Sequence, residues 1–480
     1  MSPLRNAALL VTLVALAVGA PTSPLLSSSI SQSSSASSAS LGSPSMSVSA
    51  AEPSATVPYA STNPNFPLWA ANSPPSVPKP ERGTLGASIM GPSNPPLELQ
   101  NPSLLAPPTT DNGEVGNVKW PMSFSPNRIQ TGGWARQQNI NVMPIAQNIA
   151  GVDMRLEAGA IREMHWHDTS EWAYVLKGTT QVTSVDSQGR NFRANVKAGD
   201  LWFFPAGVPH SLQATDDDPD GTEFLLVFPD GKFSEDDTFL LTDWLAHVPA
   251  EVIQKNFQLN SSEPFSRIPD KPLYIFPGTS PDTAEPVVDP NGQVPESFYY
   301  PFSNVTPTPL AGGSVKIVDS RTFPISTSIS AAELTVEPGA LRELHWHPTM
   351  DEWAYFLEGE ARVTVFASNG NAKTFNYQAG DIGTHFSAIN RHWRSLTFSA
   401  PAYVPASFGH YVENTGNTTL KFLELFNTDI YQDISLSQWL ALSPPELLKA
   451  HLGLDDETIA HLNKTKATVV APMVVDNHAL

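Results

Sequence analysis

The sequence predicts an all-β protein made of two tandem jelly-roll β-barrel domains, each with a small helical appendage. Three observations support this prediction. A domain-sized segment occurs twice, short alternating apolar runs are separated by Gly, Asn and Asp, and helical periodicity is confined to the end of each repeat. Short strands of this kind, bounded by turn residues, are typical of antiparallel sandwiches and barrels.

The first residues have the order of a secretory signal peptide. Arg5 supplies a positive charge, residues 7–18 form a short apolar run, and Gly19 and Ala20 offer a cleavage site. The run is too short for a comfortable membrane span. We therefore expect residues 1–20 to be a signal peptide and the protein to be secreted, with no membrane contact after cleavage. Four Asn-x-Ser/Thr sequons are compatible with a secreted glycoprotein: Asn260, Asn304, Asn417 and Asn463.

Composition then divides the rest of the chain. Residues 21–110 are rich in Ser and Pro and bury too little apolar surface to offset their ordering entropy, so we expect disorder there and a packed arm only after about Pro80. The repeats place one barrel domain at 111–290 and the second at 291–460, followed by a tail at 461–480. Helical pattern is expected around 241–246 and 249–255, and again around 436–442 and 445–452.

The repeat is visible in two strings of the same length, each followed four or five residues later by a Glu. Residues 159–167 read Gly-Ala-Ile-Arg-Glu-Met-His-Trp-His and are followed by Glu171, whereas residues 339–347 read Gly-Ala-Leu-Arg-Glu-Leu-His-Trp-His and are followed by Glu352. Ala-Gly-Asp at 198–200 matches 379–381, and Trp-Leu-Ala at 244–246 matches 439–441. Duplication of a whole domain explains these matches.

Each repeat carries a candidate metal site. Two histidines two positions apart point to the same face of a strand, a Glu follows after a turn, and a third His approaches from a neighbouring strand. The ligands are His165, His167, Glu171 and His210 in the first half, and His345, His347, Glu352 and His410 in the second. Any one His is more often a buried polar residue, but six of the twelve histidines fall at repeated positions. Four such ligands leave two open octahedral positions, which suits Mn²⁺ better than zinc, although the sequence does not settle the metal.

These strings resemble the cupin superfamily. Within it, the segments at 162–167, 342–347, 405–414 and 230–239 resemble the bicupin oxalate decarboxylases, and the similarity spans roughly residues 115–455. The resemblance implies that Arg162 and Arg342 grip the substrate, oxalate. An offset of three from the first His points each Arg away from the site unless the strand bulges, so this role rests on the resemblance.

The resemblance also implies a mobile lid whose Glu acts as an acid. The matching segment is Ser-Glu-Asp-Asp at 234–237, which gives Glu235 this role; the best-known members have Asn and Ser in place of Asp236 and Asp237. Glu424 is the candidate acid of the second half and aligns with Leu226 of the first. Glu235 could alternatively be a solvated loop residue.

The implied activity is conversion of oxalate to formate and carbon dioxide with two Mn²⁺ per chain and dioxygen as co-catalyst. Without proton delivery by Glu235, oxidation with peroxide release becomes the default, so an oxalate oxidase is the main alternative. A storage or binding bicupin is a third reading, and the retention of all eight ligands argues against it. We place catalysis at the first site.

The second half has one irregularity. Asp200 precedes His210 by ten residues, whereas Asp381 precedes His410 by twenty-nine; removal of the nineteen residues 384–402 restores the family spacing. This insertion is either a genuine loop or a retained intron, of which we favour the intron; sequencing of the spliced transcript decides between them. If the loop is genuine, His385 and His392 are decoys beside the second site.

Composition excludes several other functions. The absence of Cys removes disulfides, thiolate catalysis and Cys-type metal sites. The net charge of −20 and a pI of about 4.9 argue against nucleic acid as a partner. A homo-oligomer remains compatible with the sequence.

Overall fold

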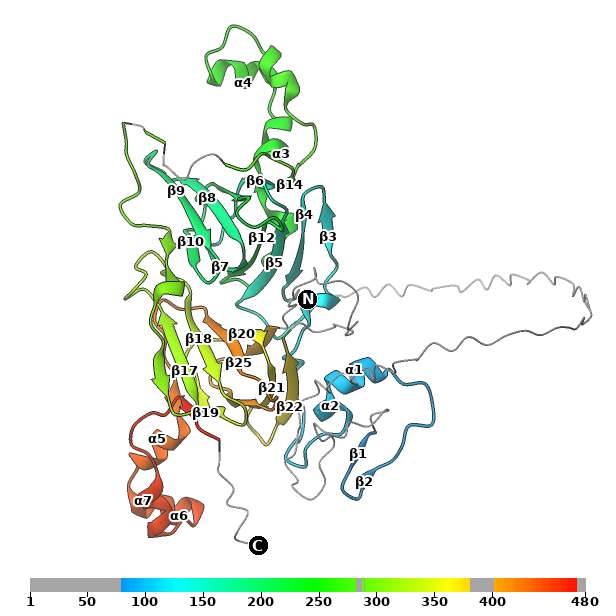
Figure 1. The fold of residues 1–480 in the computed structure, drawn as a ribbon, viewed down its shortest axis with the longest axis vertical. Coiled ribbons are helices and arrows are strands. Elements are labelled where there is room, and N and C mark those ends of the chain that lie inside the picture. Colours follow the sequence, from blue (N-terminus) through cyan, green and yellow to red (C-terminus); the bar gives the residue numbers. More distant parts are fainter. Residues whose placement is uncertain (1–78, 282–286, 289, 380–400, 473–480) are drawn as a thin grey trace, which may run out of the picture. The chain divides into compact units, whose positions relative to one another are not determined.

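The computed structural model describes residues 79–281, 287–288, 290–379 and 401–472. The predicted signal peptide and most of the Ser/Pro-rich segment lie outside these residues. So does the irregular segment 384–402, apart from residues 401 and 402, whose backbone belongs to a strand. The described part is mostly strand, in agreement with the predicted all-β class (Figure 1).

The first barrel is built from two antiparallel sheets. One has the order β15 (Tyr299–Tyr300), β10 (Leu201–Phe204), β7 (Glu171–Lys177), β12 (Thr222–Phe228), β5 (Ala150–Leu156), β4 (Gly133–Gln138), β3 (Arg128–Gln130). The other has the order β13 (Phe239–Leu240), β6 (Ile161–Trp166), β11 (His210–Ala214), β8 (Thr179–Val185), β9 (Asn191–Lys197), and β14 (Ile275–Phe276) also pairs with β6.

The second barrel repeats this arrangement, with six strands in its first sheet among the described residues where the first barrel has seven. Its first sheet has the order β16 (Thr308–Leu310), β17 (Gly313–Val318), β18 (Ser330–Val336), β25 (Leu420–Phe426), β20 (Glu352–Glu358), β23 (Pro401–Val404). Its second has the order β22 (Ala372–Gln378), β21 (Glu360–Phe366), β24 (Gly409–Asn414), β19 (Leu341–Trp346), β26 (Ile434–Ser435), and β27 (Val469–Val470) also pairs with β19. This correspondence between the halves agrees with the predicted tandem jelly-roll barrels.

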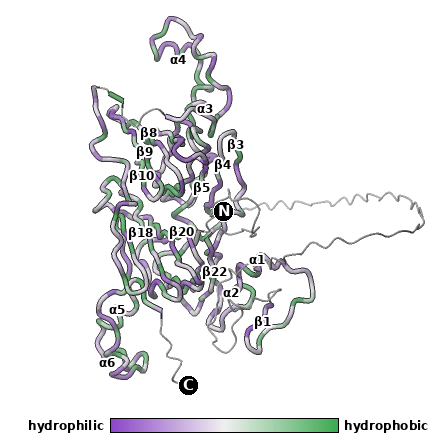
Figure 2. Tube along the Cα trace, in the orientation of Figure 1, coloured by the Kyte–Doolittle hydropathy of each residue, from purple (hydrophilic) through white to green (hydrophobic). Residues whose placement is uncertain are grey.

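Each barrel encloses its own apolar core. Apolar residues recur along the strands (Figure 2), and successive strand side chains point to opposite faces. In the first barrel Val152, Met154 and Leu156 are fully buried inside, and in the second Leu334 and Val336 occupy the equivalent positions on β18. The packed interior fixes the strands that carry the candidate ligands.

Short helices form the two appendages, and four of them lie at the places that the sequence predicts. The first contains α3 (Leu241–Ala246) and α4 (Ala250–Asn256) with the 3-10 helix η3 (Glu263–Arg267); the second contains α5 (Leu436–Ala441), α6 (Pro445–Leu452) and α7 (Asp456–His461). Trp244 of α3 lies edge-on to Trp166 of β6, with ring centroids 5.5 Å apart, and Trp439 packs on Trp346 in the same way. Each appendage therefore rests on the strand that carries one candidate ligand and directly precedes a second.

The segment before each barrel packs on the other barrel. The N-terminal arm contains β1 (Glu81–Arg82), β2 (Leu85–Gly86), α1 (Pro95–Gln100) and α2 (Pro102–Leu105) and lies beside β22 of the second barrel (Figure 1). After it, the carbonyl of Val118 accepts a 3.0 Å hydrogen bond from the Tyr403 amide of β23. In the reciprocal contact, the carbonyl of Phe298, just before β15, accepts a 2.8 Å bond from the Phe203 amide of β10. This exchange of segments ties the two halves together.

A third apolar core lies between the barrels. It combines outward-facing residues of β7, β10 and β12 with those of β18, β20 and β25, among them Trp172 and Trp353. The Trp353 indole N–H donates a 2.7 Å hydrogen bond to Gln138, and Tyr174 donates a 2.9 Å bond to Glu333. A Cβ on Gly151 would lie 2.4 Å from the Trp353 ring, so only glycine fits at that position.

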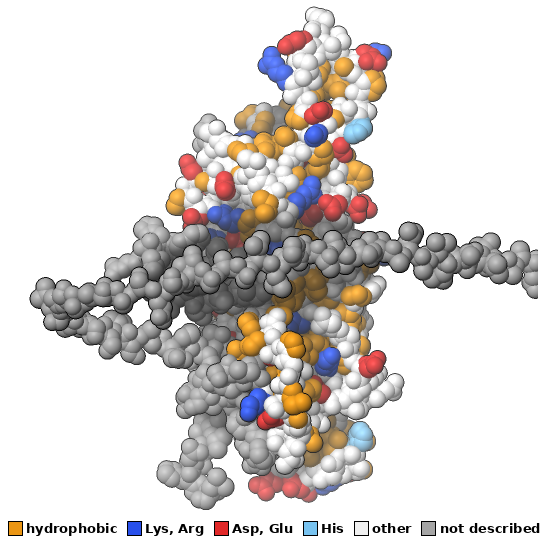
Figure 3. Space-filling model, turned by 90° about the vertical axis from the view of Figure 1, so that its right-hand side faces the viewer, with side chains coloured by type: hydrophobic (Ala, Val, Ile, Leu, Met, Phe, Trp, Pro, Cys, Tyr) orange, Lys and Arg blue, Asp and Glu red, His pale blue; other side chains and the backbone are white. Residues whose placement is uncertain are grey.

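Charged side chains of both signs are interspersed on the face drawn in Figure 3, and the coloured residues of that face form no broad basic surface. No helix in the described part of the chain has both the length and the apolarity needed to cross a membrane.

One buried carboxylate outside the metal sites predicts a pH-dependent stability. Asp153 of β5 is 1 % exposed, and neither of its carboxylate oxygens has a hydrogen-bond partner among the described residues. Burial, followed by the charge of Glu223, raises its pKa well above the usual value, while Arg136 opposes the rise. The folded state therefore binds this proton more tightly than the unfolded chain, whose Asp has a pKa of about 4.

The stability that the protonated group contributes is complete below about pH 4 and is lost as pH rises through the higher folded-state pKa. We expect the change in the free energy of unfolding caused by Asp153→Asn to be more stabilising at pH 7 than at pH 4, by at least about 1 kcal/mol. The reason is that each unit by which the pKa is raised corresponds to about 1.4 kcal/mol. Thermal or urea unfolding at both pH values measures this difference. The exposed Asp270→Asn is the control, and an equal effect of Asp153→Asn at both pH values would contradict the prediction.

Candidate metal centres

The strand β6 and the turn after it supply two histidines to the first site. His165 lies on β6 and His167 directly follows it, so both side chains face the barrel interior, where each is 3 % exposed. Nδ1 of His165 lies 2.6 Å from the carbonyl of Glu163, and Nδ1 of His167 lies 2.6 Å from that of Thr169. A ring N–H bonded to a backbone carbonyl leaves Nε2 as the free lone pair that a metal takes.

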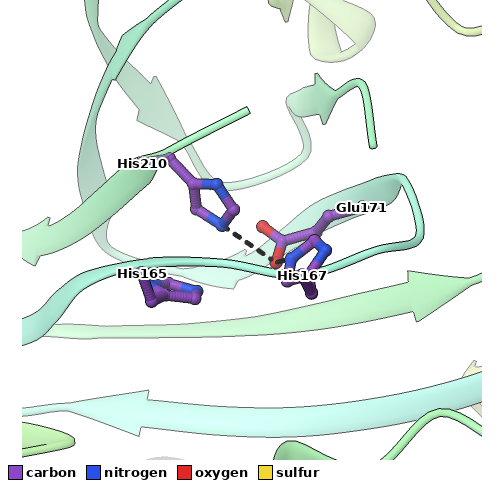
Figure 4. Close-up of side chains that lie close together, drawn as sticks. All are labelled: His165, His167, Glu171 and His210. Carbon is purple, nitrogen blue, oxygen red and sulfur yellow. Dashed lines mark hydrogen bonds and ion pairs between the residues drawn. The ribbon is translucent and has the colours of Figure 1, made fainter. Parts of the chain in front are cut away.

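The remaining two candidate ligands come from β11, which neighbours β6, and from β7, which belongs to the other sheet of the barrel. His210 begins β11 and is the direct cross-strand partner of His165. Glu171 begins β7, and its Oε2 lies 3.3 Å from Nε2 of His167 and 3.5 Å from Nε2 of His210. The Trp202 indole N–H donates a 2.8 Å hydrogen bond to Oε1 of Glu171 and fixes the carboxylate. Figure 4 shows the four side chains gathered together.

The second barrel reproduces the quartet. His345 pairs across the strands with His410, and Oε2 of Glu352 lies 3.0 Å from Nε2 of His347 and 2.9 Å from Nε2 of His410. All four residues are buried, and within each quartet the candidate ligand atoms lie within 4.8 Å of one another. The structure therefore brings together both sets of four residues that the sequence singles out.

The electrostatics of both quartets fit a bound cation. Burial alone would raise the pKa of Glu171, but His210 and His167 hold it well below the usual range, so the carboxylate is ionised. Burial, followed by the charge of Arg162, lowers the pKa of His165 well below its usual value, so that ring is neutral. Nε2 of His210 and of His345 are buried and have no hydrogen-bond partner among the described residues. A neutral imidazole, inward-facing ring nitrogens without a hydrogen-bond partner and an ionised carboxylate are features of the donor set that a divalent metal requires.

A β-bulge explains how each Arg reaches its site. Between β6 and β11 the pairing runs from His165–His210 to Arg162–Leu212, so three steps on β6 match two steps on β11. The extra residue brings Arg162 onto the same face as His165, where it is 1 % exposed. The register between Arg342 and His345 shifts in the same way against β24. On a regular strand, an Arg three residues before the first His would point away from the site. The bulge turns its side chain inward.

A buried Glu holds each bulge in place. Glu163 accepts hydrogen bonds from the Tyr274 amide at 2.5 Å and from the Thr242 hydroxyl at 2.9 Å, and its own amide donates to the carbonyl of Tyr274 at 3.0 Å. Glu343 makes the same pair of backbone contacts with Thr468, both at 2.9 Å. Tyr274 and Thr468 both have positive φ, 60° and 58°, a conformation that costs free energy and is repeated in both halves.

Glu235 lies over the first site. The 3-10 helix η2 (Glu235–Asp237) is capped by Ser234, and the Glu235 side chain is 6 % exposed. Its Oε2 accepts a 2.5 Å hydrogen bond from the Tyr274 hydroxyl and lies 3.4 Å from Nη2 of Arg162. The Arg162 guanidinium also stacks on the Tyr274 ring, 4.1 Å from its centroid. The structure therefore connects the predicted acid to the predicted substrate-binding Arg.

The second site differs in how its Arg is neutralised. Arg342 donates to Glu424 at 3.2 Å, to Asp433 at 2.8 Å and to the Tyr431 hydroxyl at 3.0 Å. Burial raises the pKa of Glu424 to about 7, against the opposing effect of Arg342. Glu424 pairs with Ala354 where the first barrel pairs Leu226 with Ala173, so the two positions are equivalent, as the sequence alignment predicts.

Several residues of these sites escape the sequence reasoning. Tyr274, Gln137 and Trp202 contact Glu235 or Glu171 in the first barrel, and Tyr431 and Asp433 contact Arg342 in the second. The repeat gives no signal for Tyr274, since its structural counterpart is Thr468. Glu163 and Glu343 are different, because their repetition was visible and could have marked them as structural partners of the site.

The fold and the two sites define a bicupin with one His/His/Glu/His metal-binding quartet in each barrel. The cupin family profile matches residues 124–264 and 307–460. Oxalate decarboxylase OxdC of Bacillus subtilis (strain 168) is 48 % identical over 396 residues, which cover 82 % of this chain and 97 % of that protein. The chain belongs to the cupin family, as a bicupin of the oxalate decarboxylase group.

Solved structures agree with this assignment. One is a structure of Bacillus subtilis oxalate decarboxylase, from work on the Mn(II) centres of that enzyme. It is 47 % identical to this chain with a TM-score of 0.77, and the match covers 83 % of this chain and 100 % of that one. A variant of the same enzyme, in which the segment Ser-Glu-Asn-Ser is replaced by Asp-Ser-Ser-Asn, has a TM-score of 0.76 with the same identity and coverage.

Single ligand substitutions should separate the two metal sites. We expect His210→Ala and His410→Ala each to lower the bound Mn²⁺ from about two to about one per chain, because loss even of an outer contact costs about 10–100-fold in affinity. Elemental analysis by mass spectrometry after dialysis measures the content. The exposed His247→Ala serves as control and should keep both ions. Full occupancy in either ligand variant would show that its quartet does not hold the metal.

Proposed function

We propose that this protein is a manganese-dependent oxalate decarboxylase that converts oxalate to formate and carbon dioxide at the first centre. The observation that carries the proposal is the contact between Arg162 and Glu235 beside a buried His/His/Glu/His quartet. Membership of the oxalate decarboxylase group supports the choice of substrate. A bound Mn²⁺, with dioxygen, would supply the one-electron chemistry that weakens the carbon–carbon bond of oxalate.

Arg162 binds one carboxylate of oxalate. It is buried, and its Nε has no hydrogen-bond partner among the described residues, so a donor is available for an incoming anion. A guanidinium offers paired N–H groups to a carboxylate, and in a site shielded from water such charge-assisted bonds are strong. His165, His167, Glu171 and His210 would hold the metal at the other end of the substrate.

Glu235 delivers the proton that makes formate. When the carbon–carbon bond of oxalate breaks, carbon dioxide leaves and the remaining one-carbon fragment needs one proton at carbon; the sum is oxalate dianion plus one proton giving formate and carbon dioxide. Burial raises the pKa of Tyr274 well above its usual value, so its hydroxyl keeps its proton and orients Oε2 of Glu235. The Glu235 side chain is buried, although Asp236 and Asp237 of the η2 turn are exposed, so the acid group itself is shielded from bulk water.

The first centre is favoured over the second by the position of its acid. Arg162 faces Glu235, which lies on a short surface turn, whereas Arg342 faces Glu424 on strand β25 and Asp433 in the loop after it. A short turn can open to admit oxalate and close over it, whereas a carboxylate on a central strand of the sheet cannot move aside. We assign the second centre a structural role or a lesser catalytic one.

Substitution of the two acids tests both parts of this proposal. We expect Glu235→Gln to reduce formate production at least about 100-fold, since general-acid catalysis contributes about 10²–10⁴-fold. Peroxide should rise in its place, because a fragment left unprotonated is oxidised to a second carbon dioxide. The matched substitution Glu424→Gln should retain most of the formate.

Formate and peroxide are assayed together on manganese-loaded protein given oxalate near pH 4. Peroxide without formate in the wild-type protein would establish an oxidase. The absence of both products would exclude oxalate as the substrate. Loss of formate in Glu424→Gln but not in Glu235→Gln would move catalysis to the second centre.

We further propose that the protein is secreted, glycosylated and homo-oligomeric. The Asn residues of all four sequons are exposed. Self-association is supported by matched exposed aromatic groups on the two appendages, with Trp244 58 % and Trp439 55 % exposed.

The natural protein is therefore expected in the culture medium, with N-glycans and as a multiple of the chain mass. Treatment with an N-glycosidase followed by light scattering measures both properties. Retention in the cell, absence of a mass shift, or a monomer by light scattering would contradict the corresponding part of this proposal.

A further inference from the structure

We propose that Arg128 is a positioning residue that holds the lid segment, residues 234–237, over the first metal centre through an ion pair with Asp236. The inference deepens the proposed function and rests on it. Nη1 of Arg128, at the start of β3, lies 3.2 Å from Oδ1 of Asp236, and the Arg128 guanidinium lies 3.6 Å from the centroid of the Tyr274 ring.

Arg128 therefore contacts two residues that adjoin the predicted acid Glu235, namely Asp236 and Tyr274. Asp236 adjoins Glu235 in the η2 turn, and the hydroxyl of Tyr274 donates to Glu235. The same Tyr274 ring is in contact with the guanidinium of Arg162. Arg128 does not touch the substrate position, but it links the lid to the ring that orients the acid.

The other contacts of the lid are also polar, and besides those of Glu235 with Tyr274 and Arg162 they include two with Gln137. The Glu235 amide donates a 2.9 Å hydrogen bond to Oε1 of Gln137, and the Gln137 amide group reaches the Ser234 hydroxyl at a longer 3.4 Å. The lid also carries three successive carboxylates, Glu235, Asp236 and Asp237, which repel one another and an oxalate dianion. Arg128 neutralises one of them, so its charge favours the closed lid in the presence of substrate.

The strength of this ion pair suits a lid that opens in every turnover. The side chains of Arg128 and Asp236 are 35 % and 76 % exposed, and such pairs are weak and screened by salt. Removing the pair should shift the ratio of closed to open lid by about two- to fivefold. The lid-like segment Ser-Glu-Asn-Ser, present in the Bacillus subtilis enzyme before its replacement in the solved variant, has Asn where this chain has Asp236. A neutral side chain at that position forms no ion pair.

The test compares four variants of the manganese-loaded protein. Asp236→Asn removes the ion pair and leaves the Arg128 stack, Arg128→Gln removes both, and the exchange Arg128→Asp/Asp236→Arg restores opposite charges. Arg267→Gln is the control. It breaks another exposed ion pair, in which Nη2 of Arg267 lies 3.3 Å from Oε1 of Glu263. This pair lies on the first helical appendage, in η3. Two readouts are made: peroxide released per formate, and hydrogen exchange of the amides at 235–238.

We expect Asp236→Asn and Arg128→Gln to raise the peroxide-to-formate ratio and to speed amide exchange, each by about two- to fivefold, because an open lid leaves the fragment unprotonated. The charge exchange should return both values toward wild type. Salt should raise both in the wild-type protein and change neither in Arg128→Gln.

Unchanged exchange in the two single variants would overturn the inference, and so would a raised KM with an unchanged product ratio. If no variant and no wild-type protein turns over oxalate, the proposed function fails, and amide exchange alone then decides whether Arg128 holds the lid.

Discussion

Both metal centres depend on one irregularity of the backbone, the extra residue that β6 and β19 carry between an Arg and the first His. On a regular strand the ligands and the Arg would lie on opposite faces, and a site that combines a metal with an anion-binding cation would not form. The bulge persists because Glu163 and Glu343 bridge it to residues in left-handed conformation, Tyr274 and Thr468. Strain in these two residues is offset by paired hydrogen bonds and by the packed barrel around them.

The same scaffold then supports two different electrostatic environments. The quartets are equivalent residue by residue, yet Arg162 has one carboxylate partner on a short turn, and Arg342 has two, Glu424 on β25 and Asp433 in the loop after it. Duplication accounts for what the halves share. Glu235 and Glu424 have no matching carboxylate in the other half. They account for the divergence of the two halves, since each changes the polar groups beside a metal site without changing the ligands.

The sequence predicts the barrels and both ligand quartets because two independent copies of each pattern are present. A single His-x-His motif is weak evidence for a metal site. Its recurrence in both halves, each time with a Glu and a distant His, is strong evidence. The bulge could not be predicted, because a register shift belongs to the pairing of two strands and not to either strand alone. Tyr274 and Gln137 have different residues, Thr468 and Ile317, at the equivalent positions of the other half, so the repeat does not mark them. Likewise, nothing in a linear order of domains indicates that Val118 packs on the second barrel and Phe298 on the first.

The contrast between rigid and weakly held parts of the site follows from these contacts. Each imidazole is fixed through a backbone carbonyl, and Glu171 is fixed by Trp202, so the ligands cannot reorient without disturbing the core. Glu235 instead sits on three residues of 3-10 helix, whose attachments are mostly to polar side chains. A metal needs constant geometry, while substrate entry and product release need a segment that moves. In the first barrel the fold meets both needs by placing the acid on a short turn in which Asp236 and Asp237 are exposed.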